Sequence, residues 1–277
     1  MSAPTLLMDG ILLGECPRWH DGRLWVADWV GQKLLTLDSG GKRTVEAEIA
    51  SLPFSFDWLP DGRMLLVHSA DNDLKLRRPD GSFERFADLS NLSGRGCNEI
   101  VIRPDGLIYV NNVDFDFPGG EFRPGFIALV GPDGSSRKVA EGLAFPNGMT
   151  ILPDGKTLVC AESFNGNLTA FDIAADGSLS NRRLWANVGP QGNDGICADA
   201  EGCIWTSAAN IVMRVREGGE VLERIELDRM CFAVMLGGDD GRTLYMVANE
   251  WTGTVDVTQP TGRVFSTRVA VPHAGYP

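Results

Sequence analysis

Short apolar runs recur along the whole chain, and turn residues separate them. In the segments 98–110 and 147–159, two such runs are joined by Asp-Gly. Asp-Gly between two apolar runs of this length is typical of a β-hairpin. A third run follows most of these pairs, at 33–37, 74–77, 126–130, 168–171 and 212–215, and another Gly-rich turn then usually leads into a fourth run. The pattern therefore predicts units of four antiparallel strands.

The turn signal that joins the first two runs recurs with a regular period. It stands at Asp21-Gly22, Asp61-Gly62, Asp105-Gly106, Asp154-Gly155, Glu201-Gly202 and Asp240-Gly241. The spacings run from 39 to 49 residues, close to the roughly 40 to 50 residues of a propeller blade. A helical solenoid of similar period would need long stretches with apolar residues at i, i+3 and i+4, which the chain lacks. We predict an all-β, six-bladed β-propeller with four antiparallel strands per blade.

The predicted propeller takes up residues 1–277 as a single domain. Its blades are expected to begin near residues 15, 54, 97, 146, 193 and 231. Residues 1–13 should supply a closure strand, with 5–8 lying beside 264–271. Blade three carries an insert at 114–123 where other blades have a short turn, and inserted loops often serve binding.

Composition and charge narrow the classes of partner. The net charge of −12 argues against nucleic acid and anionic membranes, which are held mainly by Lys and Arg clusters. The sequence shows neither a signal peptide nor a long apolar span, and its six cysteines form no CxxC pair. We therefore expect a cytoplasmic protein with reduced thiols, a small-molecule substrate, and a monomeric or weakly homo-oligomeric state.

Polar residues recur at one phase of the predicted first strands. Seven or eight positions before each turn glycine stand Glu15, Ser55 (or Phe54), Asn98, Asn147 and Asp194, whereas blade six offers Phe232 or Ala233. Because the first strand of each blade lines the central channel, these side chains should ring one of its openings. The alternative is that each caps a strand end and bonds to a neighbouring turn.

Four oxygen-bearing side chains at one phase favour a bound ligand over capping. Buried polar groups without partners cost a few kcal/mol each, and a cation would satisfy several at once. Carboxylate and amide oxygens without Cys or His favour Ca²⁺, Mg²⁺ or Mn²⁺, although Zn²⁺ also accepts oxygen ligands. The sequence therefore predicts one divalent metal ion at the mouth of the channel.

Other candidate chemistry is weaker. No GxSxG elbow, P-loop, dinucleotide fingerprint or HExxH helix occurs. Of the three histidines, His20 is expected in a turn, His273 in the tail, and His68 in a structural role at a strand end. The run 71–73 resembles the start of a calcium loop but lacks its later Gly and Glu, so a solvated turn is preferred. Glu162 is expected to support a blade turn.

The sequence motifs around the polar positions resemble those of a known protein family. They are GECPRW at 14–19, CNEI at 97–100, FPNGM at 145–149 and NDGICADAEGCIW at 193–205. Four motifs in this order resemble the gluconolactonase, regucalcin (senescence marker protein) and LRE-like family of metal-dependent lactonases. The resemblance covers nearly the whole chain.

This resemblance implies roles for individual residues. Glu15, Asn147 and Asp194 match the family's metal ligands, and Asn98 matches a substrate contact near the metal. By the same analogy, Asp194 would also be the catalytic general base in hydrolysis of a sugar (aldono) lactone. Ca²⁺ is the first choice of metal, with Zn²⁺, Mn²⁺ and Mg²⁺ as alternatives.

The sequence departs from the family where regucalcin-like members carry an Arg two residues before the matched Asn. Gly96 stands there instead, with Arg95 one step earlier, and the family's acidic substrate contact falls near Asp116. Arg95 and Asp116 are therefore candidate substrate-binding residues. A phosphotriesterase-like hydrolase on the same metal site, or a non-enzymatic calcium-containing propeller that binds a small molecule, remain the alternative functions.

Overall fold

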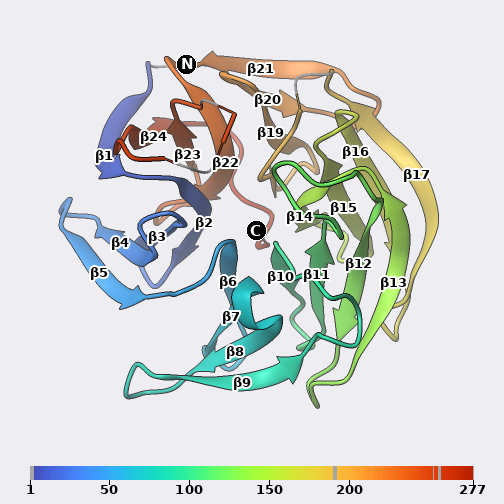
Figure 1. Cartoon of the computed structure of the whole chain (residues 1–277). Helices are drawn as coiled ribbons and strands as arrows, with labels where there is room; N and C mark the ends of the chain where they lie inside the picture. Colours follow the sequence, from blue (N-terminus) through green and yellow to red (C-terminus); the bar gives the residue numbers. More distant parts are fainter. Residues whose placement is uncertain (1–2, 190–191, 252, 255–256, 277) are drawn as a thin grey trace.

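Six four-stranded antiparallel sheets are arranged around a central channel (Figure 1). The structure is a computed structural model that describes residues 3–189, 192–251, 253–254 and 257–276. The predicted six-bladed propeller is confirmed, and the described part of the chain contains no α-helix. Among the described residues, no helix is long and apolar enough to cross a membrane.

The first three blades follow one another along the chain. Blade one consists of β2 (Gly14–His20), β3 (Arg23–Asp28), β4 (Lys33–Asp38) and β5 (Arg43–Glu48). Blade two consists of β6 (Phe54–Trp58), β7 (Met64–His68), the 3₁₀ helix η1 (Ser69–Asp71), β8 (Asp73–Arg77) and β9 (Phe83–Asp88). Blade three consists of β10 (Ile100–Ile102), β11 (Ile108–Asn112), β12 (Gly125–Val130) and β13 (Ser136–Leu143).

The other three blades complete the ring. Blade four consists of β14 (Pro146–Ile151), β15 (Thr157–Glu162), β16 (Asn167–Ile173) and β17 (Leu179–Asn187). Blade five consists of β18 (Cys197–Ala198), β19 (Ile204–Ala208), β20 (Ile211–Val215) and β21 (Val221–Glu226). Blade six consists of β22 (Met230–Gly237), β23 (Thr243–Asn249) and β24 (Gly262–Arg268), with β1 (Thr5–Ile11) as its outermost strand.

Both ends of the chain contribute to closure. The N-terminal strand β1 pairs antiparallel with β24, and Leu6 lies opposite Phe265, which is the predicted pairing. Beyond β24 the chain crosses to blade five: the Ala200 amide donates to the Pro272 carbonyl, and the Ala274 amide donates to the Ala198 carbonyl. The C-terminus therefore lies at the central channel (Figure 1).

The hydrophobic core lies between neighbouring blades. Innermost strands such as β14 are buried along their whole length, whereas outer strands such as β5 are largely exposed. The simple alternation of buried and exposed residues is lost on inner strands because adjoining blades cover both faces. For example, Val67 of blade two and Val110 of blade three belong to one apolar cluster. All six cysteines are buried free thiols.

Candidate active site at one mouth of the channel

One pocket of about 800 Å³ is lined by all six residues that the sequence analysis proposed as metal ligands or substrate contacts. We call it the upper pocket. The six residues are Glu15, Arg95, Asn98, Asp116, Asn147 and Asp194. These positions are far apart in the sequence, and the ring arrangement of the blades brings them to one pocket.

Close approach of two blades brings Asn147 and Asp194 to the same place. Each is followed by a glycine, Gly148 in β14 and Gly195 before β18. A Cβ on Gly148 would lie 2.7 Å from the Asp194 carbonyl oxygen, and one on Gly195 would lie 2.6 Å from the Ala233 Cβ. Such contacts are too short for side chains, so these glycines let the backbones pack directly. The Asn-Gly and Asp-Gly pairs of the two motifs are explained by this packing.

Glu15 reaches the pocket from a bulged strand. The register of β2 against β3 shifts between Glu15 and Arg18, and Cys16 has φ of 46°. A bulge changes the usual alternation of a strand. Glu15 therefore lines the upper pocket while Arg18, three residues later, lines the opposite end of the channel.

Hydrogen bonds behind the pocket fix its polar residues. The Ser55 hydroxyl donates to the Asn98 carbonyl at 2.6 Å, so the ring position of blade two supports that of blade three. The Asn147 side-chain amide donates to the Ser163 hydroxyl at 3.3 Å. Ser163 in turn donates to the Asn193 carbonyl at 2.6 Å, next to Asp194.

We define the floor of the upper pocket as Glu15, Asn98, Asn147 and Asp194. Its two carboxyl groups lie near each other and near that of Glu99. Burial raises the pKa of Asp194 to about 8, with the nearby Glu99 charge acting in the same direction. Burial, followed by the charges of Asp194 and Glu99, raises the pKa of Glu15 well above its usual range. Each carboxylate therefore destabilises the ionised form of its neighbours, as like charges do.

Two oxygen atoms of this floor have no hydrogen-bond donor. They are Oδ1 of Asn98 and Oδ1 of Asp194, and both are buried. The Glu15 carboxylate accepts one bond, from the Cys16 amide at 3.2 Å. Unpartnered acceptors beside crowded carboxylates are the chemistry that a hard cation satisfies. The residues present therefore fit a divalent metal ion.

Glu99 is a buried acid that the sequence analysis did not single out. It follows Asn98 directly, and its carboxylate pairs with the Arg18 guanidinium at 3.2 Å in the interior. Burial raises the pKa of Glu99, and the Arg18 charge partly offsets that effect. The interior of the channel thus carries one cation below a group of acids.

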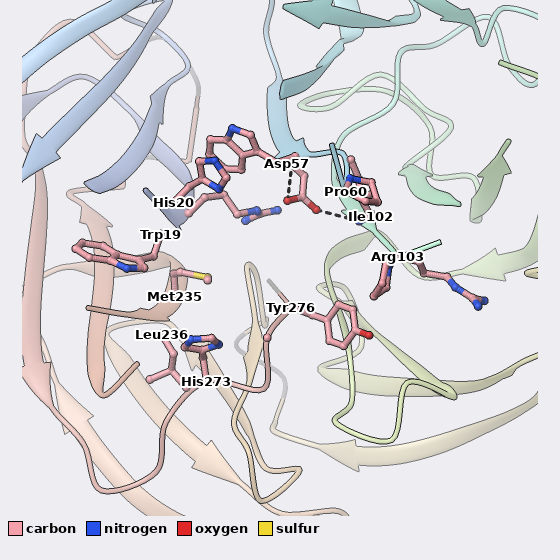
Figure 2. Close-up of a pocket in the computed structure, with 14 residues that line it drawn as sticks. Trp19, His20, Asp57, Pro60, Ile102, Arg103, Met235, Leu236, His273 and Tyr276 are labelled. Atoms are coloured by element: carbon pink, nitrogen blue, oxygen red, sulfur yellow. Dashed lines mark hydrogen bonds between the residues drawn. The ribbon is translucent and has the colours of Figure 1, made fainter. Parts of the chain in front are cut away.

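The opposite end of the channel forms a second, smaller pocket of about 270 Å³, which we call the lower pocket (Figure 2). Asp57 points into it and accepts hydrogen bonds from the Trp58 amide at 2.8 Å and the Ile102 amide at 2.9 Å. His20, the last residue of β2 and so not in the turn itself, stacks on Trp58 at 4.0 Å. His273 and Tyr276 of the C-terminal segment line the same pocket.

Arg95 and Asp116 line the upper pocket but already bind each other. Arg95 donates Nε to Asp116 Oδ1 at 3.0 Å and an Nη atom to Oδ2 at 2.9 Å. This pair ties the blade-three insert to the segment before β10. Gly96 packs against the backbone of Ser69, where an added Cβ would lie 2.2 Å from the carbonyl oxygen. The position that carries Arg in the family pattern therefore has no room for a side chain here.

Aromatic side chains form one side of the upper pocket, a feature that periodicity did not reveal. We define the aromatic wall as Phe115, Phe117, Phe122, Phe145 and Phe164. Phe145 and Phe164 stack at 4.7 Å, and Phe117 contacts Phe145 edge-on at 4.9 Å. Three of the five rings belong to the insert, which the sequence did suggest as a binding element.

Two other nominated positions have structural roles. Glu162 is buried and accepts a bond from the Ala144 amide at 2.6 Å, as expected for support of a blade turn. The turn at 71–73 is only partly solvated, because Asp73 is buried. His68, Asp71 and Asp73 bring ligand atoms within 4.8 Å of one another. However, Lys75 pairs with Asp71 and Arg85 with Asp73, so cations already neutralise this group.

Comparison with known proteins now defines the class of this propeller. A family model described as the SMP-30/Gluconolactonase/LRE-like region matches residues 13–250. The chain belongs to this family, as its motifs predicted.

Individual relatives are more distant. Regucalcin of Xenopus laevis is 26% identical over 255 residues, covering 85% of this chain and 83% of that protein. A protein of Rhizobium meliloti (strain 1021) named for sugar lactone lactonase activity is 27% identical over 289 residues, covering 99% of this chain and 91% of its own. The structure of a calcium-binding protein, regucalcin, from Agrobacterium tumefaciens str. C58 has a TM-score of 0.78 at 24% identity, covering 98% of this chain and 95% of that one. This last likeness concerns the fold.

Proposed function

We propose that the protein is a metal-dependent hydrolase that opens a small lactone. The observation that carries the proposal is the floor of the upper pocket, where unpartnered oxygens of Asn98 and Asp194 lie with the carboxylate of Glu15. Membership of the family and the lactonase name of the bacterial relative support this reaction. A sugar lactone is the substrate that this name suggests.

Glu15, Asn147 and Asp194 would hold the ion. The donor set contains oxygen atoms only, which favours Ca²⁺, and a structural relative is described as calcium-binding. When bound, a divalent cation polarises an ester carbonyl and stabilises the charge that develops on its oxygen. Zn²⁺, Mn²⁺ and Mg²⁺ are the alternatives to be tested.

The side chains of this chain would supply positioning and proton transfer. Asp194 accepts a proton from water as the water oxygen bonds to the carbonyl carbon. The ring C–O bond then breaks, and the proton passes from Asp194 to the departing alcohol oxygen. The product is the open hydroxy acid. Asn98, which lines the same pocket as Asp194, would bind the substrate.

The proposal is tested by removing metal with a chelator and restoring Ca²⁺, Mg²⁺, Mn²⁺ or Zn²⁺ singly. Acid release from a panel of lactones is followed after subtraction of spontaneous opening. We expect hydrolysis to disappear with the metal and to return with at least one ion. If the restored protein hydrolyses phosphotriesters but no lactone, the reaction class is wrong. If it binds metal and hydrolyses neither, the protein is a binding propeller.

A further inference from the structure

Four of the nine large apolar side chains found exposed among the described residues belong to the upper pocket or its aromatic wall. They are Leu52, Phe117, Phe122 and Phe164. Exposed apolar side chains scattered singly need no explanation, but a contiguous group beside a cleft marks a binding surface. Phe117 is 47% exposed and Phe164 is 50% exposed. A bound ligand with an apolar group would therefore remove the rings of Phe117 and Phe164 from contact with solvent.

Apolar side chains also line the upper pocket on the sides of blades six and one. Phe232 and Trp251 meet edge-on at 5.5 Å on the side of blade six. Trp29, on the side of blade one, donates its indole N–H to the Phe54 carbonyl at 2.6 Å, so its polar atom is already engaged. Leu52 and Pro53 adjoin it. Apolar side chains therefore lie on several sides of the polar floor.

Few polar groups above the floor remain to bind sugar hydroxyls. The hydroxyl protons of Ser69 and Ser163 are donated to backbone carbonyls. Arg95 and Asp116 direct two hydrogen bonds at each other, which leaves fewer of their polar atoms for a ligand. A polyhydroxylated ring placed here would exchange bonds to water for incomplete bonds to protein, which is unfavourable.

We infer that the substrate carries an apolar substituent, an alkyl chain or an aryl ring, that lies on the aromatic wall while its ester lies over Glu15, Asn147 and Asp194. The inference rests on the proposed function and replaces the sugar lactone suggested by the relative's name with a lactone that carries an apolar substituent. Four of the five rings of the wall line the same pocket as the floor, and its volume of about 800 Å³ is much larger than a sugar lactone ring. Apolar pockets with a few convergent polar groups are the usual form of small-molecule sites.

The first experiment compares kcat/KM for γ-butyrolactone, γ-octalactone and γ-undecalactone with that for aldonolactones of the same ring size. We expect kcat/KM to rise roughly fourfold for each methylene that becomes buried. Aldonolactones should be hydrolysed less efficiently than γ-octalactone. An aldonolactone that is hydrolysed at least as efficiently as the alkyl lactones would overturn the inference.

The second experiment truncates the wall. In Phe164→Ala and Phe117→Ala, the ratio of kcat/KM for γ-undecalactone to that for γ-butyrolactone should fall about tenfold, since each ring offers a large contact area. Phe164→Leu should retain most of the ratio. Leu184→Ala is the matched control, because Leu184 is an apolar residue of the same blade, 61% exposed and outside the pocket. An unchanged ratio in both Phe variants contradicts the inference.

Binding separates failure of the inference from failure of the proposed reaction. The lactam of γ-undecalactone resists hydrolysis, and calorimetry should show that it binds more tightly than the lactam of γ-butyrolactone and that Phe164→Ala removes most of the difference. If no lactone is hydrolysed but this pattern holds, the apolar subsite stands and the reaction is wrong. If Phe117→Ala instead changes the molecular mass in solution, the wall is an interface between protein chains and the inference fails.

Discussion

The two mouths of the channel are built from the same inner strands but differ in what their polar groups bind. In the upper pocket, buried oxygens of Asn98 and Asp194 lack donors. In the lower pocket, both carboxylate oxygens of Asp57 accept backbone amides, and the C-terminal segment contributes to the lining. Buried acceptors without partners are unfavourable for stability. Among the described residues, unpartnered buried side-chain oxygens line the upper pocket but not the lower one, and this difference marks the upper mouth as the site for a ligand.

The largest expected effect distinguishes the mouths by catalysis. Asp194→Asn should lower kcat for the best lactone by about 10²–10⁴-fold, the usual contribution of a general base. Tyr276→Phe, at the lower mouth, should change kcat by less than about twofold, because the surface substitution alters no catalytic group. Steady-state kinetics with saturating metal provide the comparison. Similar losses in both variants would mean that the two mouths act together.

Deletion of residues 272–277 should affect stability far more than catalysis. Three backbone hydrogen bonds hold this segment: Pro272 and Ala274 bond to blade five, and the His273 amide donates to the Gly241 carbonyl of blade six. Each hydrogen bond contributes about 1 kcal/mol to the free energy of unfolding, so the loss of all three should lower Tm by roughly 5–10 °C. KM should stay unchanged because the upper pocket is built without this segment. A raised KM with an unchanged Tm would reverse the assignment of the two ends.

The stability of the metal-free protein should fall as pH rises from about 6 to 8. Between its ordinary pKa of 3.8 and about 8, Asp194 holds a proton in the folded state that the unfolded state has released. Its stabilising effect is complete below pH 3.8 and is lost as pH passes about 8, and Glu15 acts in the same direction. Burial raises the pKa of Asp57 to about 6, so Asp57 contributes to the fall in stability mainly below about pH 6.

Thermal unfolding at closely spaced pH values, with and without metal, tests this predicted pH dependence of stability. Added metal should abolish the fall between pH 6 and 8, because a bound cation replaces the proton among the carboxylates. Asp194→Asn should flatten the same region in the metal-free protein. Equal slopes with and without metal would show that the carboxylates of the upper floor do not bind it.

How far the sequence predicted these features depends on how local their causes are. The blades were predictable because Asp-Gly turns such as Asp105-Gly106 act locally and repeat. The ring of polar residues followed from that repeat. Glu99 and Arg18 were not predicted as a pair, because a bulge near Cys16 turns Arg18 into the channel. The aromatic wall comes from three separate segments, and no periodicity fixes the path of the insert.

The smallest expected effect concerns the ion pair that holds the insert over the upper mouth. Arg95→Gln removes the positive charge and the two paired hydrogen bonds to Asp116. The Arg95 side chain is partly exposed and the Asp116 side chain is largely exposed. Exposed ion pairs contribute little, so KM for an apolar lactone should rise by less than about fivefold with kcat nearly constant. A higher salt concentration should raise KM of the wild-type protein by a similar factor and leave KM of the variant unchanged. Loss of kcat instead would place Arg95 among the groups that contact the reacting ester, which would extend the catalytic floor outward to the rim.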